Sequence, residues 1–568
     1  MFGVIKYQQK KYNYKIVGLQ KSFKNIDICF EGKIYNQNNL KFEYLYNLYY
    51  QFKTNMFRKI DGTFNIAIYD KVKEKLYIAR DKVGEKPLYL YQSSNNFAFS
   101  DKLKDFYNLP TFTKKINKAG LVSFLEYGYV LESDSIFENV SKVKSGHFVE
   151  YDLKYKKFTQ KQYWCIDEYY QKDKFNFPEK KIINSVEKIL HKSITKRLNN
   201  NKKIAVSLSG GFDSSTIATI LSQQSKTPID TFTIGFYEQK LDEAPYSKAL
   251  ANYLGTNHYE IYFSDNDALN IIPKLYKFYD EPFADHGAVA TILLSKIITE
   301  NKHQAYFAGD GADKIFGTYR SKSRLNSFFA LSIYIRKILY ILLSIVNIKA
   351  IPFVANYKNI AYKYEKMLLV LKSENIPEMI KIRNLQFLQS EIEILLQQKI
   401  FYTNTFDEIK LYSNMEYIDK ILSTDFKTFV KGIELTKSSG SIRSFGVEAI
   451  KPYLDEELIE YMIRVPQSIK IKNNIPKYVL KQIIYKYVPQ KLMNRPKSGF
   501  AIPIERWMKG VLKELIYEQL SYSRLKNDEI FDTKSILEIR DKFYRGEHQI
   551  GYKLWYLFIF QLWYQDIN

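Results

Sequence analysis

The segment Lys203–Thr216, with the sequence KIAVSLSGGFDSST, constrains this chain more than any other. It begins as an apolar run typical of a buried strand, which ends at Leu208, and the turn Ser209–Gly211 then leads into a helical sequence. Two glycines let backbone N–H groups approach a ligand closely, and a helix N-terminus carries a partial positive charge. Together with the serine hydroxyls, these features predict a cradle for phosphate or pyrophosphate.

Asp213 indicates that a cation accompanies the phosphate, because a carboxylate repels phosphate unless a cation lies between them. We interpret it as a ligand of Mg²⁺. No Gly-Lys-Ser/Thr follows the turn, so the segment is not a Walker loop. An ordinary strand–turn–helix would have the same outline. The complete Ser-Gly-Gly-x-Asp-Ser-Ser pattern is more specific than that, and it resembles the loop of ATP pyrophosphatases, which split ATP between the α and β phosphates.

A second glycine-rich turn, Ala308–Tyr319, follows another apolar strand sequence. It contains Asp310 and Asp313, which share one face if a helix begins here. Asp213 and Asp313 could then converge on one Mg²⁺ that holds a pyrophosphate. The alternative is a glycine-rich helix start with capping aspartates.

The bulk composition narrows the function classes. The net charge is +24, but Lys and Arg are spread along the chain without a block of like charge, and no recognition motif accompanies them, so nucleic-acid binding is disfavoured. The two cysteines, Cys29 and Cys165, permit neither a disulfide framework nor a zinc site, which indicates a reducing, cytoplasmic location.

The most apolar segment is Ser327–Val354, and Arg336 and Lys337 interrupt it. The remaining run is too short for a membrane span, which needs about 20 residues. We expect a buried or amphipathic helix here, with contact at a membrane surface as the alternative.

The pattern along the chain predicts two domains. Residues 1–165 contain short strand sequences separated by turns, residues 166–179 are irregular and suggest a linker, and residues 180–568 begin with alternating strands and helices. That alternation predicts a doubly wound parallel sheet, followed by a mostly helical part from about residue 320. Ser209 and Gly309 should both lie at carboxyl ends of its strands.

Taken together, the motifs resemble the asparagine synthetase family of amide-forming ligases. The matching segments lie in the family's order along nearly the whole chain: Asp61–Asp70, Ala79–Tyr89, Phe97–Asp101, the Ser209 loop, Thr233–Phe236, Asp242–Tyr246, Asp280–Phe283, Gly309–Tyr319, Glu448–Asp455, Lys477 and Arg495–Phe500. The resemblance implies an N-terminal α+β sandwich of the N-terminal-nucleophile glutaminase type. It also implies a synthetase domain that adenylates a carboxylate with ATP, releases pyrophosphate and lets ammonia attack.

The resemblance also implies roles for individual residues. Pyrophosphate and its Mg²⁺ are bound by Ser209, Gly210, Gly211, Asp213 and Ser214, and Asp313 shares the metal. The adenosine half of ATP contacts Leu208, Ile234 and Gly309. The catalytic residues are Lys477 and Asp310, and Lys477 stabilises the phosphate charge of the adenylation transition state.

The N-terminal domain departs from the family pattern. Family glutaminases begin Met-Cys-Gly and use the cysteine as the nucleophile. This chain begins Met1-Phe2-Gly3, has Glu31 in place of an oxyanion-hole amide and Lys33 in place of a substrate-binding Glu, although Asp61 remains. The family's Arg-Gly-Pro-Asp segment is also missing. We therefore expect no glutamine hydrolysis, and nitrogen from ammonia, a substrate amine or a separate glutaminase.

The synthetase domain departs near the expected acceptor pocket. Lys314 stands where the family usually has Glu, Ala308 replaces Ser, Ile450 replaces Arg, and His286 replaces a small polar residue. The acceptor could be aspartate, a sugar acid of a surface polysaccharide, or an acid that closes a lactam ring. A nucleotide-binding pseudoenzyme subunit and a nucleic-acid-binding protein are the alternatives from other classes. A homodimer is possible for any of them.

Overall fold

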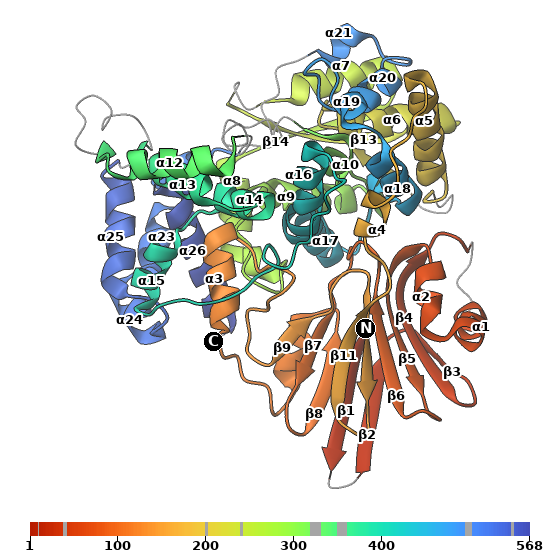
Figure 1. The fold of residues 1–568 in the computed structure, drawn as a ribbon, viewed down its shortest axis with the longest axis horizontal. Coiled ribbons are helices and arrows are strands. Elements are labelled where there is room, and N and C mark those ends of the chain that lie inside the picture. Colours follow the sequence, from red (N-terminus) through yellow and green to blue (C-terminus); the bar gives the residue numbers. More distant parts are fainter. Residues whose placement is uncertain are drawn as a thin grey trace.

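The computed structural model describes residues 1–8, 11–37, 42–198, 203–238, 242–318, 331–348, 360–494, 502–546 and 550–567. Its N-terminal part contains two antiparallel sheets that pack face to face (Figure 1). The first sheet has the order β2 (Lys11–Val17), β1 (Phe2–Gln8), β8 (Asn96–Ser100), β7 (Tyr89–Gln92), β9 (Val140–Lys142). The second has the order β11 (Lys157–Gln162), β10 (His147–Asp152), β6 (Lys75–Arg80), β5 (Gly62–Asp70), β4 (Ile26–Ile34), β3 (Gln20–Ser22).

Strand β5 is apolar on both faces because both faces are covered. Ile66 and Ile68 belong to one core with the helices α1 (Phe42–Phe52) and α2 (Met56–Lys59), whereas Ala67 faces the core between the two sheets. The outer face of the first sheet is covered by a core that includes α3 (residues 118–127). The layers are therefore helix, sheet, sheet, helix, which confirms the predicted α+β sandwich.

The short strand sequences expected in residues 1–165 overlap strands β4, β5, β6, β7 and β10; they are Ile26–Phe30, Phe64–Tyr69, Lys75–Ala79, Pro87–Tyr91 and Phe148–Leu153. The run Pro87–Tyr91 becomes β7 only from Tyr89, since Pro87 has no N–H to donate to a neighbouring strand. The first sheet depends largely on strands that sequence reasoning missed. In β1, the pairing Phe2 with Ser100 aligns segments almost a hundred residues apart.

The segment expected to be a linker is packed. It contains the short helix α4 (Asp167–Tyr170), and Phe175 donates its N–H to the carbonyl of Arg464, at the end of α18 (Glu456–Arg464). The Arg464 guanidinium lies 4.3 Å from the centre of the Phe175 ring. Helix α5 (Glu179–Thr195) follows Pro178.

The second part of the chain is built on a parallel sheet. Its order is β14 (Asn257–Phe263), β13 (Asp230–Phe236), β12 (Ile204–Ser207), β15 (Ala305–Phe307), β16 (Glu448–Ile450). Helices α5, α6 (Phe212–Gln224) and α7 (Ala244–Leu254) contribute to the core on one face, and α9 (Gly287–Glu300) contributes to the core on the other. Helices on both faces confirm the doubly wound sheet.

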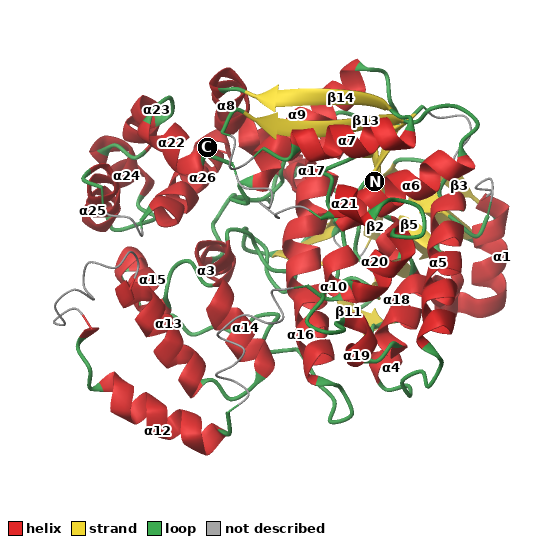
Figure 2. Cartoon of the chain, turned by 90° about the horizontal axis from the view of Figure 1, so that it is seen from above, coloured by secondary structure: helices red, strands yellow, loops and turns green. Residues whose placement is uncertain are grey.

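The remainder is mostly helical, as expected. The helices of this part, shown in Figures 1 and 2, are α8 (Asp265–Ile271), α10 (Ala312–Phe316), α12 (Ile333–Ser344), α13 (Ile360–Lys372), α14 (Ile376–Asn384), α15 (Gln389–Leu396), α16 (Tyr417–Asp425), the π-helical segment Phe426–Glu434, α17 (Leu435–Ser444), α18, α19 (Gln467–Lys470), α20 (Tyr478–Ile484), α21 (Gln490–Met493), α22 (Ile504–Lys509), α23 (Lys513–Gln519), α24 (Tyr522–Asp528), α25 (Thr533–Tyr544) and α26 (Gly551–Ile567).

Two of these helices bear on the expectations. Helix α26 is buried almost all round and joins the two parts of the chain, because Tyr556 donates to the Tyr127 carbonyl at 3.1 Å. Within the second part, Trp555 donates to the Ala284 carbonyl at 2.8 Å. Helix α12 covers the middle of the apolar segment Ser327–Val354 and is not buried: four of its aliphatic side chains are exposed, while Arg336 is buried. Among the described residues, no helix combines the length and the apolarity that a membrane crossing requires.

Candidate active site

The two glycine loops meet at the point where the strand order reverses. Strand β12 lies between β13 and β15, so the chain winds one way from β12 to β14 and the other way to β15 and β16. In open α/β sheets, ligands bind in the crevice beyond the carboxyl ends of such neighbouring strands. The loop after β12 carries Ser209, and the loop after β15 carries Gly309.

The first loop has the local geometry of an anion cradle. Gly210 has φ +68°, a left-handed conformation that suits glycine, and α6 begins two residues later. The Ser209 N–H donates to Ser214 Oγ at 3.1 Å, and the two hydroxyl oxygens are also 3.1 Å apart. The structure therefore brings together the serines and glycines predicted to bind pyrophosphate, at the N-terminus of a helix.

The second loop approaches the first so closely that a side chain would be crowded. A Cβ on Gly309 would lie 3.0 Å from the Cβ of Asp213. Gly311 has φ +88°, and a Cβ there would lie 2.3 Å from a side-chain carbon of Leu454. The glycines thus allow the β15 loop to pack between α6 and the segment that follows β16.

Lys477 lies between the two predicted metal ligands. It precedes α20 in a left-handed conformation with φ +53°, and its N–H donates to the Gly317 carbonyl at 3.1 Å. Its Nζ lies 2.5 Å and 2.6 Å from the two carboxylate oxygens of Asp213 and forms an ion pair with Asp313. Burial alone would lower the pKa of Lys477, but the two carboxylates outweigh it and hold the pKa above its ordinary value.

The donor set at this point fits Mg²⁺. Asp213 and Asp313 supply hard carboxylate oxygens, and they converge on the same ammonium group. Protein sites for Mg²⁺ often use only one or two carboxylates and complete the coordination with substrate phosphates and water. Among the described residues, no group of three or more His, Cys, Asp or Glu side chains is placed to hold a metal by itself.

The remaining predicted residues are near the same loops. Leu208 is fully buried and donates its N–H to the Phe232 carbonyl, and Ile234 on β13 is also buried, so neither side chain presents an open surface for adenosine. Asp310 is partly exposed, yet its Oδ2 is buried without a hydrogen-bond partner among the described residues. Of the matching segments, Arg495–Phe500 and the end of Gly309–Tyr319 lie outside the described residues.

Lys314 points into a different network from that of Lys477. It is buried, donates to Asp425 Oδ2 at 3.0 Å and lies 4.4 Å from the centre of the Phe429 ring. Asp425 is also paired with Arg383 at 3.3 Å. The lysine that replaces the family's usual Glu is therefore neutralised locally, away from the Asp213–Lys477–Asp313 cluster.

Three residues of the site were missed by sequence reasoning. Glu434 ends the π-helical segment and accepts a 2.8 Å hydrogen bond from the Gly311 N–H. Lys437, one helical turn later, lies 3.7 Å from Asp285, and Tyr453 donates to the Asp213 carbonyl at 2.9 Å. For Glu434 and Lys437 the signal was a pair of charged residues three apart in a helical sequence, and Tyr453 lies within the matching segment Glu448–Asp455. Burial raises the pKa of Glu434 to about 7 against the attraction of Lys314, and Asp310 and Asp313 act in the same direction as burial.

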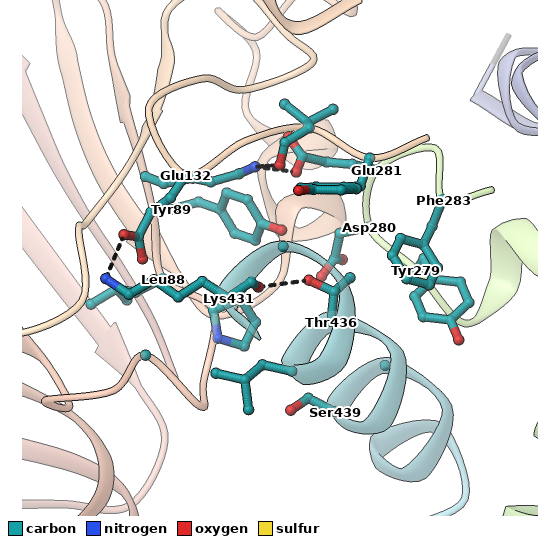
Figure 3. Close-up of a pocket in the computed structure, with 18 of the residues that line it drawn as sticks. Leu88, Tyr89, Glu132, Tyr279, Asp280, Glu281, Phe283, Lys431, Thr436 and Ser439 are labelled. Atoms are coloured by element: carbon teal, nitrogen blue, oxygen red, sulfur yellow. Dashed lines mark hydrogen bonds and ion pairs between the residues drawn. The ribbon is translucent and has the colours of Figure 1, made fainter. Parts of the chain in front are cut away.

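A cavity of about 90 Å³ lies between the N-terminal sandwich and the helices of the second part. Figure 3 shows Tyr89 and Glu132 on one side and Lys431, Thr436 and Ser439 on the other. The segment Asp280–Phe283 closes it and joins the two parts, because Glu281 accepts from the Ile136 N–H at 2.9 Å and pairs with Lys142 at 2.5 Å.

A second cavity occupies the expected glutamine site and is lined by charged pairs. Glu31 accepts from the Met1 ammonium group and from Lys86, both at 2.8 Å, and Lys33 pairs with Glu448 at 2.6 Å. Burial opposes ionisation of Glu31, but Lys86 and the ammonium group overcome it and lower its pKa to about 2. Asp61 pairs with Lys196 at 2.6 Å. An anion therefore occupies the position where the family has an amide.

Comparison with known proteins agrees with this architecture. A family model described as asparagine synthase matches residues 185–565, and a model described as a glutamine amidotransferase domain matches residues 18–164. Asparagine synthetase (glutamine-hydrolyzing) 1 of Bacillus subtilis is 24% identical over 562 residues, which cover 94% of this chain and 85% of that protein. A Methanocaldococcus jannaschii relative with an asparagine synthetase name is 30% identical over 310 residues, which cover 52% of this chain and 59% of the relative. The parallel sheet and both glycine loops lie within the larger match, and the chain belongs to the asparagine synthase family of ATP-dependent amide-forming ligases.

Proposed function

We propose that this chain adenylates a carboxylate with ATP, releases pyrophosphate, and transfers nitrogen from ammonia or an amine to form an amide. The observation that carries the proposal is the position of Lys477 between Asp213 and Asp313, at the mouth of the two glycine loops. Carboxylates and an ammonium group at a helix N-terminus suit a site where phosphate charge and a cation are handled together.

In this proposal the β12 loop binds the pyrophosphate half of ATP. The backbone N–H groups of Gly210 and Gly211 and the hydroxyls of Ser209 and Ser214 donate to phosphate oxygens. Gly309, on the β15 loop that faces the β12 loop, adds no side-chain atoms to the other side of this binding site. Leu208, Ile234 and Gly309 flank the adenosine half, with backbone groups at the carboxyl ends of the strands making the contacts.

Asp213 and Asp313 would hold Mg²⁺, which would neutralise charge on the departing pyrophosphate. Lys477 exchanges its carboxylate partners for phosphate oxygens as ATP binds. Because its buried ammonium group stays charged throughout, it stabilises the additional negative charge that develops as the bond to the α-phosphate breaks. In this proposal Asp310, whose Oδ2 is buried without a hydrogen-bond partner among the described residues, accepts a proton or hydrogen bond from the attacking nitrogen.

The acceptor carboxylate remains open between aspartate, a sugar acid of a surface polysaccharide and a lactam-forming acid. Two features support an acceptor other than the family's usual one. Ile450 is buried at the end of β16, where the family has a cationic Arg, and Lys314 is bound to Asp425. Lys437, paired with Asp285, is the cation best placed to compensate.

We also propose that the N-terminal domain does not hydrolyse glutamine. Phe2 supplies no nucleophile, and the Glu31 carboxylate would repel the oxyanion of a tetrahedral intermediate. Ammonia, a substrate amine or a separate glutaminase then supplies nitrogen, and the domain remains as a wall of the cavity in Figure 3. In this proposal the two domains are residues 1–165 and 180–568, the protein is cytoplasmic, and it is a candidate homodimer.

The test is a screen of acids with purified protein and Mg-ATP, with ammonia present and then absent. We expect AMP and pyrophosphate from at least one acid, with amide formed only when ammonia or an amine is present. ADP as the only nucleotide product would refute the mechanism. Tight ATP binding without cleavage, across all acids and amines, would instead support a pseudoenzyme subunit.

A further inference from the structure

The outer face of α12 carries a continuous apolar stripe. Its members recur at the spacing of one helical face, and all of them are exposed. Their exposed fractions are Tyr334 77%, Ile335 49%, Ile338 58%, Ile341 59%, Leu342 60% and Ile345 79%. A soluble surface helix normally shows the reverse arrangement. Contiguous exposed apolar patches mark sites of interaction when they are large.

The contacts of α12 hold this stripe outward. Arg336, on the opposite side of the helix, is buried, and its Nη1 donates to the Ser373 carbonyl at 2.6 Å. Tyr364 on α13 donates to the Leu343 carbonyl, also at 2.6 Å. Figure 2 shows α12 at the rim of the molecule with α13 on its inner side. The helix is therefore anchored on the side that carries Arg336 and Leu343, and the stripe is presented to the surroundings.

The sequence on either side of α12 is rich in cations. From Ile315 to Tyr364 the chain has no Asp or Glu, and the whole chain has a net charge of +24. Lys337 is exposed next to the stripe, and on the neighbouring α13 both Lys363 and Glu365 are exposed. An aliphatic face flanked by cations is typical of a helix that lies in the interface of an anionic membrane.

We propose that α12 binds the surface of an anionic lipid bilayer, with the stripe inserted among the acyl chains and Lys337 at the level of the headgroup phosphates. The helix spans only Ile333–Ser344, so it can lie in the interface but not cross the bilayer. A second copy of the chain is a poorer occupant, because a symmetric contact through α12 would bring a helix that has no acidic residue to pair with the cations. A bilayer with anionic headgroups neutralises them.

The experiment is flotation of the full chain with vesicles of phosphatidylglycerol and phosphatidylcholine in equal parts, and with vesicles of phosphatidylcholine alone. We expect binding to the anionic vesicles and much weaker binding to the neutral ones. The triple variant Ile338→Gln, Ile341→Gln, Leu342→Gln should lower binding by about tenfold or more, because it removes apolar area from the stripe without adding charge. Phe401→Gln is the matched control, since Phe401 is 88% exposed outside α12, and it should bind like the unmodified protein.

Lys337→Gln separates the electrostatic contribution from the apolar one. It should weaken binding to anionic vesicles. It should also reduce the loss of vesicle binding that about 0.5 M salt causes, because less electrostatic attraction then remains for salt to screen. The proposal is overturned if the unmodified protein floats with neither vesicle, or if the triple variant binds as well as the control. It is also overturned if the triple variant changes the oligomeric state while vesicle binding is absent, which would identify the stripe as a protein interface.

Discussion

Replacing Lys477 by methionine keeps the length of the side chain and removes its charge from between Asp213 and Asp313. Leaving a buried ion pair without one partner costs about 3–5 kcal/mol. Here the Asp213 and Asp313 side chains are 26% and 35% exposed, so water solvates part of the released charge. We therefore expect the free energy of unfolding to fall by about 2–3 kcal/mol.

The effect on catalysis should be larger than the effect on ATP binding. Lys477 already has anionic partners in the ligand-free protein, so the exchange of carboxylate for phosphate contributes little net affinity. Loss of one preorganised donor to charge that develops in the transition state costs about 3–4 kcal/mol, or roughly 10²–10³-fold in turnover. The affinity for ATP should change by less than about tenfold.

The assay is pyrophosphate release at saturating Mg-ATP, with ATP affinity measured separately by calorimetry and stability by urea unfolding. Lys470→Met is the matched control, because Lys470 is a buried lysine paired with Asp419 at 2.7 Å, outside the site. It should lose stability as Lys477→Met does, yet retain turnover per folded molecule. Equal losses of turnover and ATP affinity in Lys477→Met, or no loss of either, would refute the reasoning.

Three further predictions follow from the site. Asp213→Asn should abolish pyrophosphate release, a loss of several kcal/mol on the order of that for a metal ligand, while thermal unfolding stays cooperative; near-native turnover would make Asp213 only a helix cap. The pKa of Glu434 is raised to about 7 in the folded protein, so its contribution to stability is fully present below its unfolded pKa and is lost as pH rises towards 7. In Glu434→Gln, on the order of 3 kcal/mol of this pH dependence should disappear. The assignment would be contradicted if the free energy of unfolding in urea, measured from pH 4.5 to 7, changed with pH as it does in the unmodified protein. Purified protein with Mg-ATP and a working acceptor should release no glutamate from glutamine, and Phe2→Cys should not restore release, since Glu31 and Lys33 remain; glutamate formed in step with AMP would show that the domain is an active glutaminase.

The local chemistry of both glycine loops was readable from the sequence. Glycines at turns, serines at a helix start and aspartates at fixed offsets reflect backbone conformation and hydrogen bonding within a few residues. For the same reason the strands β4, β5 and β6 were recognisable, since each is a short apolar run bounded by turns. The order of motifs along the chain was sufficient to identify the family.

Long-range partners were not readable in the same way. Strand β16 pairs with β15 across the interval from Phe307 to Glu448, and its short sequence has no pattern of its own. Glu434 gains its raised pKa only because packing buries it beside Gly311 and the aspartates of the β15 loop. Sequence periodicity reports which side of an element is apolar, but it does not report which distant element will cover it.

The sequence by itself determined that a phosphate-binding loop, a second acidic turn and a degenerate glutaminase motif exist, because each depends on neighbouring residues. Only the tertiary structure decided that Lys477 lies between Asp213 and Asp313, that Lys314 turns away to Asp425, and that the apolar side of α12 is exposed. Those outcomes depend on which surfaces pack together, and the free energy of packing is shared among contacts far apart in the chain.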